Sequence, residues 1–142
     1  MPAVAVRAKE LRYAVDLTAA GELREETGVV LDVPAEWSPE HLILAALVRC
    51  SLKSLNHHAG RNGVNVGSAS GGGRTLVTKR ETNERYALVE TDVDLAVDLE
   101  PEPEPDALAE LLALAERDCF VGSSLTAKPS YRRTVNGRTI GL

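Results

Sequence analysis

The chain carries two cysteines, Cys50 and Cys119, and each lies within or just after a segment with a helical pattern. A thiolate can attack a peroxide, and a second thiol can convert the resulting sulfenic acid into a disulfide. Free cysteine is also among the most frequently buried residue types, so either thiol can equally be a small core side chain. The two are 69 positions apart (119 minus 50), and bonding requires their Cα atoms to come within roughly 4.4–6.8 Å. Two hypotheses therefore stand: the cysteines form a redox pair, or they are small side chains of the hydrophobic core.

The surroundings of Cys50 decide whether its thiol can react. Ile43 and Leu47 share its face of a helix, so those surroundings are predicted to be apolar. Burial among apolar side chains raises the pKa of a thiol and makes it inert. Reactivity therefore requires a nearby cation, which Lys53, one helical turn further on, or an arginine from elsewhere in the fold would supply.

Composition limits the classes of protein to which the chain can belong. Its 142 residues and 44% hydrophobic content fit one globular domain, which we expect to span residues 1–142. The net charge of -5 argues against a nucleic-acid binder. No apolar run approaches the roughly 18 residues of a membrane span, and residues 1–7 lack the pattern of a secretory signal. We therefore expect a cytoplasmic protein, in which a disulfide would be transient and functional.

The hydrophobic pattern of the first half predicts two strands and a helix. Residues 9–17 and 22–33 alternate in the manner of strands. A helix is predicted from Ser38, a good N-cap followed by proline, to about residue 58, with Gly60 as its end. Every side chain from residue 42 to residue 48 is apolar, which predicts a helix buried on all sides.

The second half is predicted to contain three β segments and one helix. In order, these are β-like residues 62–79, a strand over 89–100, a proline-rich connector over 100–105, a helix over 106–117 and a strand over 130–135. The three glycines at 71–73 are interpreted as a hairpin tip or bulge, and Asn136-Gly137 as a hairpin turn. The whole is expected to be one α+β domain.

Two segments resemble the motifs of a known family. Residues 38–50 read Ser-Pro-Glu-His-Leu-Ile-Leu-Ala-Ala-Leu-Val-Arg-Cys and resemble the cysteine helix of the OsmC/Ohr family (osmotically inducible protein C and organic hydroperoxide resistance protein). Residues 119–125 read Cys-Phe-Val-Gly-Ser-Ser-Leu and resemble that family's second motif, usually Cys-Pro-Val followed by small polar residues and leucine. The order of the predicted elements also matches over most of the chain.

The resemblance implies a fold and an activity. The fold would be an OsmC-like fold, in which antiparallel sheets wrap around two central helices in an intertwined homodimer. The activity would be the peroxiredoxin-like, thiol-dependent reduction of organic hydroperoxides or hydrogen peroxide, as part of an oxidative stress response. Cys50 would be the peroxidatic thiol, Cys119 the resolving thiol, and Glu40 would orient an active-site arginine. No bound cofactor is implied, because an external dithiol, such as a lipoyl-type dithiol, would restore both thiols.

The chain departs from the family pattern in two places. Phe120 stands where the family usually has proline, which changes the geometry beside the second cysteine. Residues 28–37, where one branch of the family carries its arginine, contain none. The candidate for that arginine is therefore Arg24, with Arg12 as a second choice.

Glu40 and Cys50 are ten residues apart on one predicted helix, which is about 15 Å along its axis. They can serve one site only through a long side chain between them or through a partner protomer, and either arrangement favours an obligate dimer. The substrate pocket is predicted to be apolar and to favour lipophilic hydroperoxides. Its predicted lining residues are Ile43, Leu47, Trp37 and Phe120.

Other functions find less support in the sequence. His57 and His58 are adjacent, so they point in different directions on a helix, and no spaced carboxylate or Cys-x-x-Cys pattern completes a metal site. We therefore expect no metal, and the expected partners are a second copy of the chain, a peroxide and a dithiol electron donor, without nucleic acid or membrane. The alternative function is a non-catalytic OsmC-fold homodimer that binds a small apolar ligand at the subunit interface.

Overall fold

The computed structural model describes residues 8–140 and divides into two compact units, residues 1–37 (unit 1) and residues 38–142 (unit 2). Residues 1–7, which lack a secretory signal pattern, lie outside the described residues. Within the described residues, each unit carries its own β-sheet, with three strands in unit 1 and four in unit 2. Both cysteines belong to unit 2.

Unit 1 is a small antiparallel sheet. Its strands are β1 (Val15–Leu17), β2 (Leu23–Glu25) and β3 (Val30–Leu31). The strand expected over 22–33 is therefore two strands, because a turn divides it. At that turn the Glu25 carboxylate accepts hydrogen bonds from the backbone N–H groups two and four residues further on, at 2.8 and 2.9 Å. Gly28, with a φ of +94°, supplies the left-handed conformation that closes the turn.

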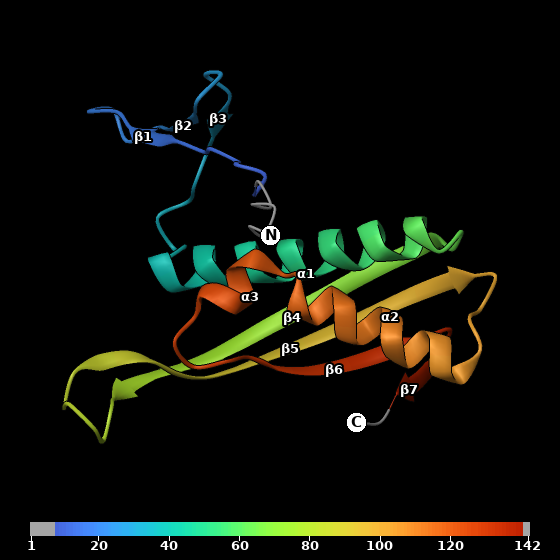
Figure 1. Cartoon of the computed structure of the whole chain (residues 1–142). Helices are drawn as coiled ribbons and strands as arrows, with labels where there is room; N and C mark the ends of the chain where they lie inside the picture. The colour runs from blue at the N-terminus through green and yellow to red at the C-terminus, as the bar shows by residue number, and fades with distance from the viewer. Residues whose placement is uncertain (1–7, 141–142) are drawn as a thin grey trace, which may run out of the picture. The chain divides into compact units, whose positions relative to one another are not determined.

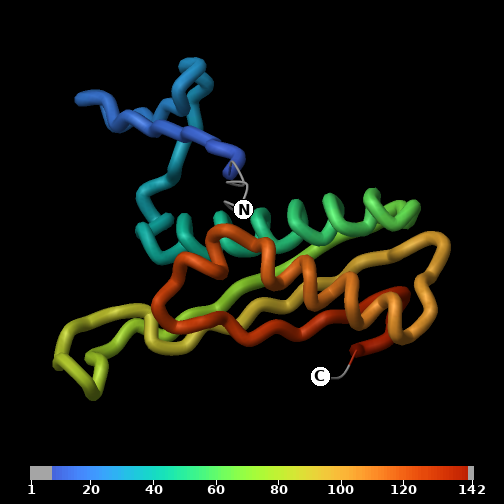
Figure 2. The backbone as a smooth tube through the Cα atoms, viewed as in Figure 1, coloured from blue at the N-terminus to red at the C-terminus, as the bar shows by residue number. Residues whose placement is uncertain are grey.

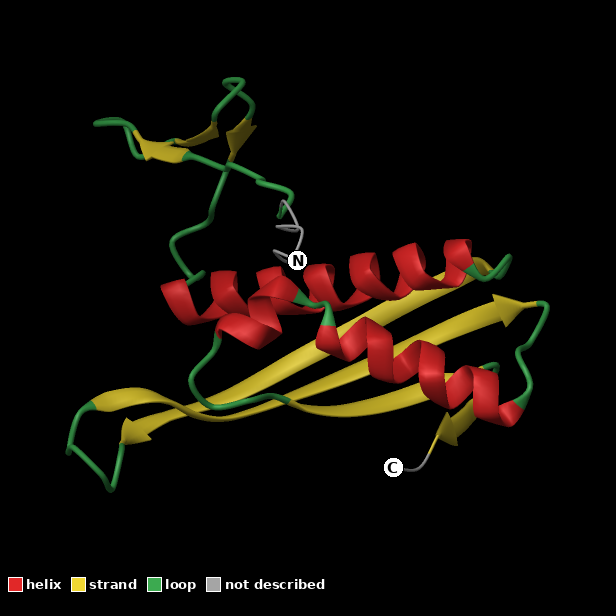
Figure 3. Ribbon diagram, in the orientation of Figure 1, coloured by secondary structure: helices red, strands yellow, loops and turns green. Residues whose placement is uncertain are grey.

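Unit 2 is a four-stranded sheet with its helices on one face (Figure 1). Its elements in chain order are α1 (Pro39–Arg61), β4 (Asn65–Lys79), β5 (Tyr86–Glu100), α2 (Pro105–Arg117), α3 (Phe120–Ser124), β6 (Ser130–Val135) and β7 (Arg138–Ile140). The long helices α1 and α2 cross the same face of the sheet (Figure 3). The strand order is β4-β5-β6-β7.

The resemblance implied antiparallel sheets, whereas the sheet of unit 2 is mixed. The backbone leaves β5, passes through α2 and α3 and returns along β6 (Figure 2). Such a crossover makes the two strands parallel, and β5 pairs with β6 in parallel register, with Val93 opposite Tyr131. The other neighbouring strands in this sheet pair in antiparallel fashion.

Helix α1 begins where the sequence predicts and ends slightly later. The Ser38 hydroxyl accepts a hydrogen bond from the backbone N–H of His41 (3.4 Å), and the His41 ring nitrogen Nδ1 accepts one from the backbone N–H of Ser38 (3.0 Å). This reciprocal cap, followed by Pro39 at the first helical position, sets the start of the helix. Gly60 does not end the helix, which continues to Arg61.

One face of α1 is buried in the single chain. Leu47, Leu55 and Ala59 belong to the core, whereas Ala45 and Ala46 are exposed. The prediction that this helix is buried on all sides is therefore correct for only one face of α1. The exposed apolar face is available to a further partner.

The three glycines at 71–73 lie inside β4 and do not form a hairpin tip, because α1 packs directly on the strand there. A Cβ atom at Gly71 would lie 2.9 Å from Cγ1 of Val48 and 3.0 Å from the carbonyl oxygen of Asp94. One at Gly73 would lie 3.2 Å from the Leu44 side chain. Gly71 and Gly73 are therefore needed for close approach of helix and strand, and the chain reverses after residue 79 instead.

Gly71→Ala is expected to destabilise the folded protein by about 1–3 kcal/mol, because the added methyl group meets both a side chain and a backbone oxygen. The matched control is Gly72→Ala, since nothing lies within 4 Å of a Cβ atom at Gly72. The measurement is the free energy of unfolding in denaturant for the two variants at equal protein concentration. Equal losses of stability in both would contradict close packing of α1 on β4 at Gly71.

The remaining sequence patterns in unit 2 are confirmed. The alternating strand β5 buries one side chain in two beneath the helices, namely Thr91, Val93, Leu95, Val97 and Leu99. The hairpin turn between β6 and β7 has φ angles of 50° at Asn136 and 80° at Gly137, as a tight two-residue hairpin requires. Helix α2 begins at Pro105.

Candidate active site

Cys50 lies in the middle of α1 with its side chain half-buried and directed toward the start of α3. Burial raises the pKa of its thiol above the ordinary value. The backbone N–H groups of Val121 and Phe120 act in the opposite direction, and the neighbouring Cys119 thiol adds to the increase. The net effect within one chain is a raised pKa, so the Cys50 thiol is mostly protonated at neutral pH.

Cys119 is fully buried at the N-cap position of α3. Its backbone N–H donates to the carbonyl oxygen of Glu116 (3.3 Å), so α2 leads directly into α3. Its sulfur lies 3.6 Å from Oγ of Ser51, and Cys50 packs against the same cluster, where Cys119 helps to raise the pKa of the Cys50 thiol. The structure therefore brings two free thiols into one cluster across 69 positions of sequence (119 minus 50).

Tyr131 on β6 completes the surroundings of Cys119, and no sequence motif pointed to it. Its side chain is buried, and burial together with Cys119 raises the pKa of its phenol to about 12. The residue that faces both groups from α3 is Gly122. A Cβ atom there would lie 2.6 Å from the Tyr131 hydroxyl oxygen and 3.4 Å from the Cys119 sulfur. Glycine at this position therefore leaves room for the hydroxyl beside the sulfur.

Arg133 is a buried arginine next to this cluster, with 8% of its surface exposed. Its guanidinium carbon lies 5.0 Å from the centre of the Tyr131 ring, and one guanidinium nitrogen lies 3.7 Å from the Glu116 carboxylate. The aromatic face and the carboxylate compensate a charge that would otherwise be costly to bury. Strand alternation from Tyr131 to Val135 is the sequence signal that places Arg133 on the inner face.

Polar side chains on one face of α1 join that helix to the end of α2. Ser54 donates a hydrogen bond to the carbonyl oxygen of Ala115 (2.7 Å). His58 Nε2 lies 2.8 Å from Oδ2 of Asp118, the residue that precedes Cys119. Because these contacts sit at spacings of three or four residues along α1, they hold the second thiol against the helix that carries the first.

Asp118 is expected to contribute stability that depends on pH. Hydrogen bonding to Arg117, aided by His58, lowers the pKa of its carboxyl from 3.8 to about 2. Folding therefore favours the carboxylate, so this contribution is complete above about pH 4 and is lost as the pH falls toward 2. The measurement is the free energy of unfolding between pH 2 and pH 6 for the natural protein and for Asp118→Asn. The difference in unfolding free energy between the two proteins should be constant above pH 5 and disappear near pH 2. A difference that stays the same down to pH 2 would contradict this role of the Asp118 carboxylate.

The family model for OsmC-like proteins matches residues 33–132, which contain both cysteines and Tyr131. The chain belongs to the OsmC-like family. None of the curated proteins compared with it matches. The match begins shortly before α1 and ends within β6, so it covers the elements that build the thiol cluster.

Solved structures with low sequence identity share the fold of this OsmC-like protein. An OsmC-like protein of unknown function from Vibrio cholerae has a TM-score of 0.70 at 16% identity, with 89% of this chain and 99% of that chain covered. An OsmC-like protein from Mycoplasma pneumoniae has a TM-score of 0.67 at 13% identity, with 91% and 99% covered. An organic hydroperoxide resistance protein from Elizabethkingia anophelis has a TM-score of 0.63 at 15% identity, with 91% and 98% covered. The OsmC-like α+β fold expected from the sequence is therefore confirmed.

The carboxylate and the cations expected around Cys50 do not gather there within unit 2. Glu40 is exposed in the first turn of α1, and about 15 Å of helix separates it from Cys50. Lys53 is exposed as well. Arg24 lies on β2 of unit 1, where its guanidinium pairs with the Glu22 carboxylate at 3.1 Å.

The four residues predicted to line a substrate pocket have different surroundings. Leu47 is 1% exposed and packs in the core with Cys119. Ile43 is half-buried on α1. Phe120 follows Cys119 directly and is 63% exposed, and Trp37, the last residue of unit 1, is exposed too.

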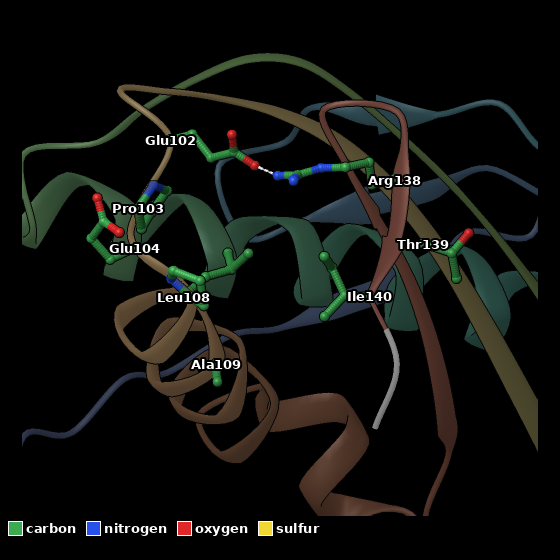
Figure 4. A pocket seen from close by; sticks show the side chains of 9 residues that line it. Glu102, Pro103, Glu104, Leu108, Ala109, Arg138, Thr139 and Ile140 are labelled. Atoms are coloured by element: carbon green, nitrogen blue, oxygen red, sulfur yellow. Dashed lines mark ion pairs between the residues drawn. The ribbon is translucent and has the colours of Figure 1, made fainter.

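A cleft in this OsmC-like protein lies between the start of α2 and β7 and contains no residue of the thiol cluster (Figure 4). An ion pair between Glu102 and Arg138 spans it. Within residues 8–140, no three His, Cys, Asp or Glu side chains gather in the manner of a metal site. No helix in the same part of the chain is long and apolar enough to cross a membrane.

Proposed function

We propose that this OsmC-like protein is a peroxiredoxin-like thiol peroxidase that reduces organic hydroperoxides or hydrogen peroxide. The observation that carries the proposal is the pairing of a half-buried thiol, Cys50, with a fully buried thiol, Cys119, in one cluster. Proteins that share the fold and are described as organic hydroperoxide resistance proteins, from Elizabethkingia anophelis and Legionella pneumophila, support the same class of function.

The difference in exposure supports different roles for the two thiols. A hydroperoxide can reach Cys50, which is half-buried, but not Cys119, which is 0% exposed. The Cys50 thiolate attacks the outer peroxide oxygen, the O–O bond breaks, and the alcohol or water leaves with one proton. The backbone N–H groups of Phe120 and Val121 face this sulfur and favour its negative charge.

Cys119 then resolves the sulfenic acid. Its sulfur bonds to the sulfur of Cys50, the S–O bond breaks, and hydroxide leaves with the thiol proton as water. An external dithiol of the lipoyl type then reduces the disulfide and is itself oxidised to a disulfide. Such a cycle suits a reducing cytoplasm, which we propose as its compartment.

The raised pKa of Cys50 in one chain requires a cation in the working protein, and we propose that a homodimer supplies it. Arg24 is the proposed cation, oriented by Glu40, with the two residues drawn from different protomers. The exposed apolar face of α1 at Ala45 and Ala46 offers a surface for the second copy. Together, the residues of the two protomers would lower the pKa of the Cys50 thiol.

Unit 1 supports the same assembly. Its short strands carry large apolar side chains that a single chain leaves exposed, among them Val15, Leu17, Val30 and Leu31. A three-stranded sheet of this size requires an apolar surface on which to pack. Sedimentation should therefore give twice the mass of one chain, and a monomer at micromolar concentration would contradict the dimer.

Reduced protein treated with cumene hydroperoxide tests the proposed function. One equivalent should consume both thiols of each chain, and peptide mapping should find the Cys50–Cys119 disulfide. Dithiothreitol should restore both thiols, and repeated additions should then consume peroxide catalytically. Retention of both thiols in excess peroxide would overturn the proposal.

The half-buried Ile43 and the exposed ring of Phe120 favour apolar hydroperoxides, so cumene hydroperoxide should react faster than hydrogen peroxide.

A non-catalytic homodimer that binds a small apolar ligand is the second candidate, and the raised pKa of Cys50 within one chain favours it. The two candidates differ in how alkylation of Cys50 by iodoacetamide depends on pH. A midpoint well below about 8.5 supports the peroxidase, because it requires a cation beside the thiolate. A midpoint at or above that value supports the ligand-binding protein.

A further inference from the structure

Two hydroxyl groups lie beside the buried sulfur of Cys119 and have no part in the steps above. Ser51 Oγ, on α1, lies 3.6 Å from that sulfur. The Tyr131 hydroxyl approaches the same region from β6. A Cβ atom at Gly122 would lie 2.6 Å from this hydroxyl oxygen and 3.4 Å from the sulfur, so both groups border the space that the missing side chain leaves.

The surrounding structure holds both hydroxyls in place. The Ser51 hydroxyl donates to the carbonyl oxygen of Leu47 (2.8 Å) while Cys119 is a thiol. It can turn to donate to the sulfur, 3.6 Å away, when that sulfur is a thiolate, since either atom of this contact can be the donor. The Tyr131 ring is packed under the Arg133 guanidinium at 5.0 Å. Since the pKa of the phenol is raised to about 12, the hydroxyl keeps its proton and remains a donor throughout the physiological range.

We propose that Tyr131 and Ser51 are positioning residues for Cys119, whose hydroxyls stabilise negative charge on its sulfur and so speed formation and reduction of the Cys50–Cys119 disulfide. The peroxide-dependent half of this inference rests on the proposed function. The thiol–disulfide half depends only on the geometry of the two sulfurs and the two hydroxyls.

Both steps place charge on the same buried atom. When the disulfide forms, the Cys119 thiol gives up its proton, the S–S bond forms, and the S–O bond at Cys50 breaks to release water. In reduction, one thiol of a dithiol attacks the more accessible Cys50 sulfur, and Cys119 leaves as a thiolate. The second thiol of the reductant then displaces Cys50, and the two protons of the dithiol end on Cys50 and Cys119. Water does not reach Cys119, which is 0% exposed, so the hydroxyls replace solvation.

Tyr131→Phe removes one hydroxyl and keeps the ring that packs against Arg133. We expect disulfide formation after one equivalent of cumene hydroperoxide, and reduction of the disulfide by dithiothreitol, both to slow about three- to tenfold at pH 7. Consumption of the first equivalent of peroxide at Cys50 should be unchanged, so dimedone should trap more Cys50 sulfenic acid. Ser51→Ala should slow the same two steps, which provides a second variant should Tyr131→Phe not fold.

The pH profile separates a positioning role from a purely structural one. Loss of a donor should move the midpoint of the disulfide-formation rate to higher pH, whereas partial unfolding would reduce the rate equally at every pH. In the described part of the chain, the titratable and charged groups around Cys119 are Cys50 and His58 on α1, Glu116, Arg117 and Asp118 at the end of α2, and Tyr131 and Arg133 on β6.

Tyr86→Phe is the matched control, because Tyr86 is exposed at the start of β5; its rates should equal those of the natural protein. Unchanged rates and pH profiles in folded Tyr131→Phe and Ser51→Ala would overturn the inference. If hydroperoxide fails to oxidise Cys50 even in the natural protein, the proposed function fails. The inference is then decided by disulfides formed with diamide and reduced with dithiothreitol.

Discussion

Cys50→Ser is expected to abolish hydroperoxide turnover, lowering the rate by more than about a thousandfold. A serine hydroxyl stays protonated at neutral pH and cannot form a sulfenic acid, so the first bond to peroxide oxygen is lost. The buried thiol of Cys119 cannot substitute for it, because it is 0% exposed. The measurement is the consumption of cumene hydroperoxide with dithiothreitol as the reductant.

Cys119→Ser is the matched comparison. This variant should still consume one equivalent of hydroperoxide per chain, since Cys50 is intact, but it should accumulate sulfenic acid and form no intramolecular disulfide. Substantial turnover by Cys50→Ser, or normal disulfide-dependent recycling by Cys119→Ser, would contradict the assigned roles. The pair of variants therefore tests the two thiols separately.

Leu47→Ala is expected to cost about 2–5 kcal/mol of folding stability, because it removes a large side chain from the core and leaves a cavity. Leu47 is 1% exposed and packs with Val93, Cys119 and Tyr131 in the smaller of the two core clusters. The cavity would lie directly behind the thiols, where the rigid sheet cannot close it. We also expect slower disulfide formation, because Cys119 would lose the contact that holds it against α1.

Chemical denaturation at equal protein concentration measures this loss, since the stability of a dimer depends on concentration. The control is Leu76→Ala on β4, where the side chain is 49% exposed, and its effect should stay within about 0.5 kcal/mol. A loss for Leu47→Ala as small as that of the control would show that Leu47 faces a pocket, as the sequence predicted, rather than the core.

Local patterns in the sequence predicted most of the elements of unit 2. The start of α1 follows from Ser38 and Pro39, and the alternation in β5 follows from a regular exchange of apolar and acidic residues. The turn at Asn136-Gly137 follows from two residues that tolerate positive φ. Each of these signals is carried by residues a few positions apart, so no knowledge of the rest of the fold is needed.

The wrong or missing interpretations involve contacts between distant segments. The glycines at 71–73 resemble a break in a strand, but the small size of Gly71 and Gly73 serves the packing of α1 on β4. The short helix α3 carries too few residues to show a periodic pattern. Arg133 is charged, so its type indicates a surface position, yet Glu116 and the Tyr131 ring compensate its burial.

The sequence by itself determined which groups could do redox chemistry, the helix that carries Cys50 and the family to which the chain belongs. Only the tertiary structure decided that the two thiols lie in one cluster, that Cys50 is half-buried and Cys119 buried, and that two hydroxyls lie near Cys119. The physical reason is that exposure and hydrogen bonding at Cys119 are set by α1, α3 and β6 packing together. Residues spread over more than 80 positions of the chain, from Leu47 to Arg133, contribute to that packing.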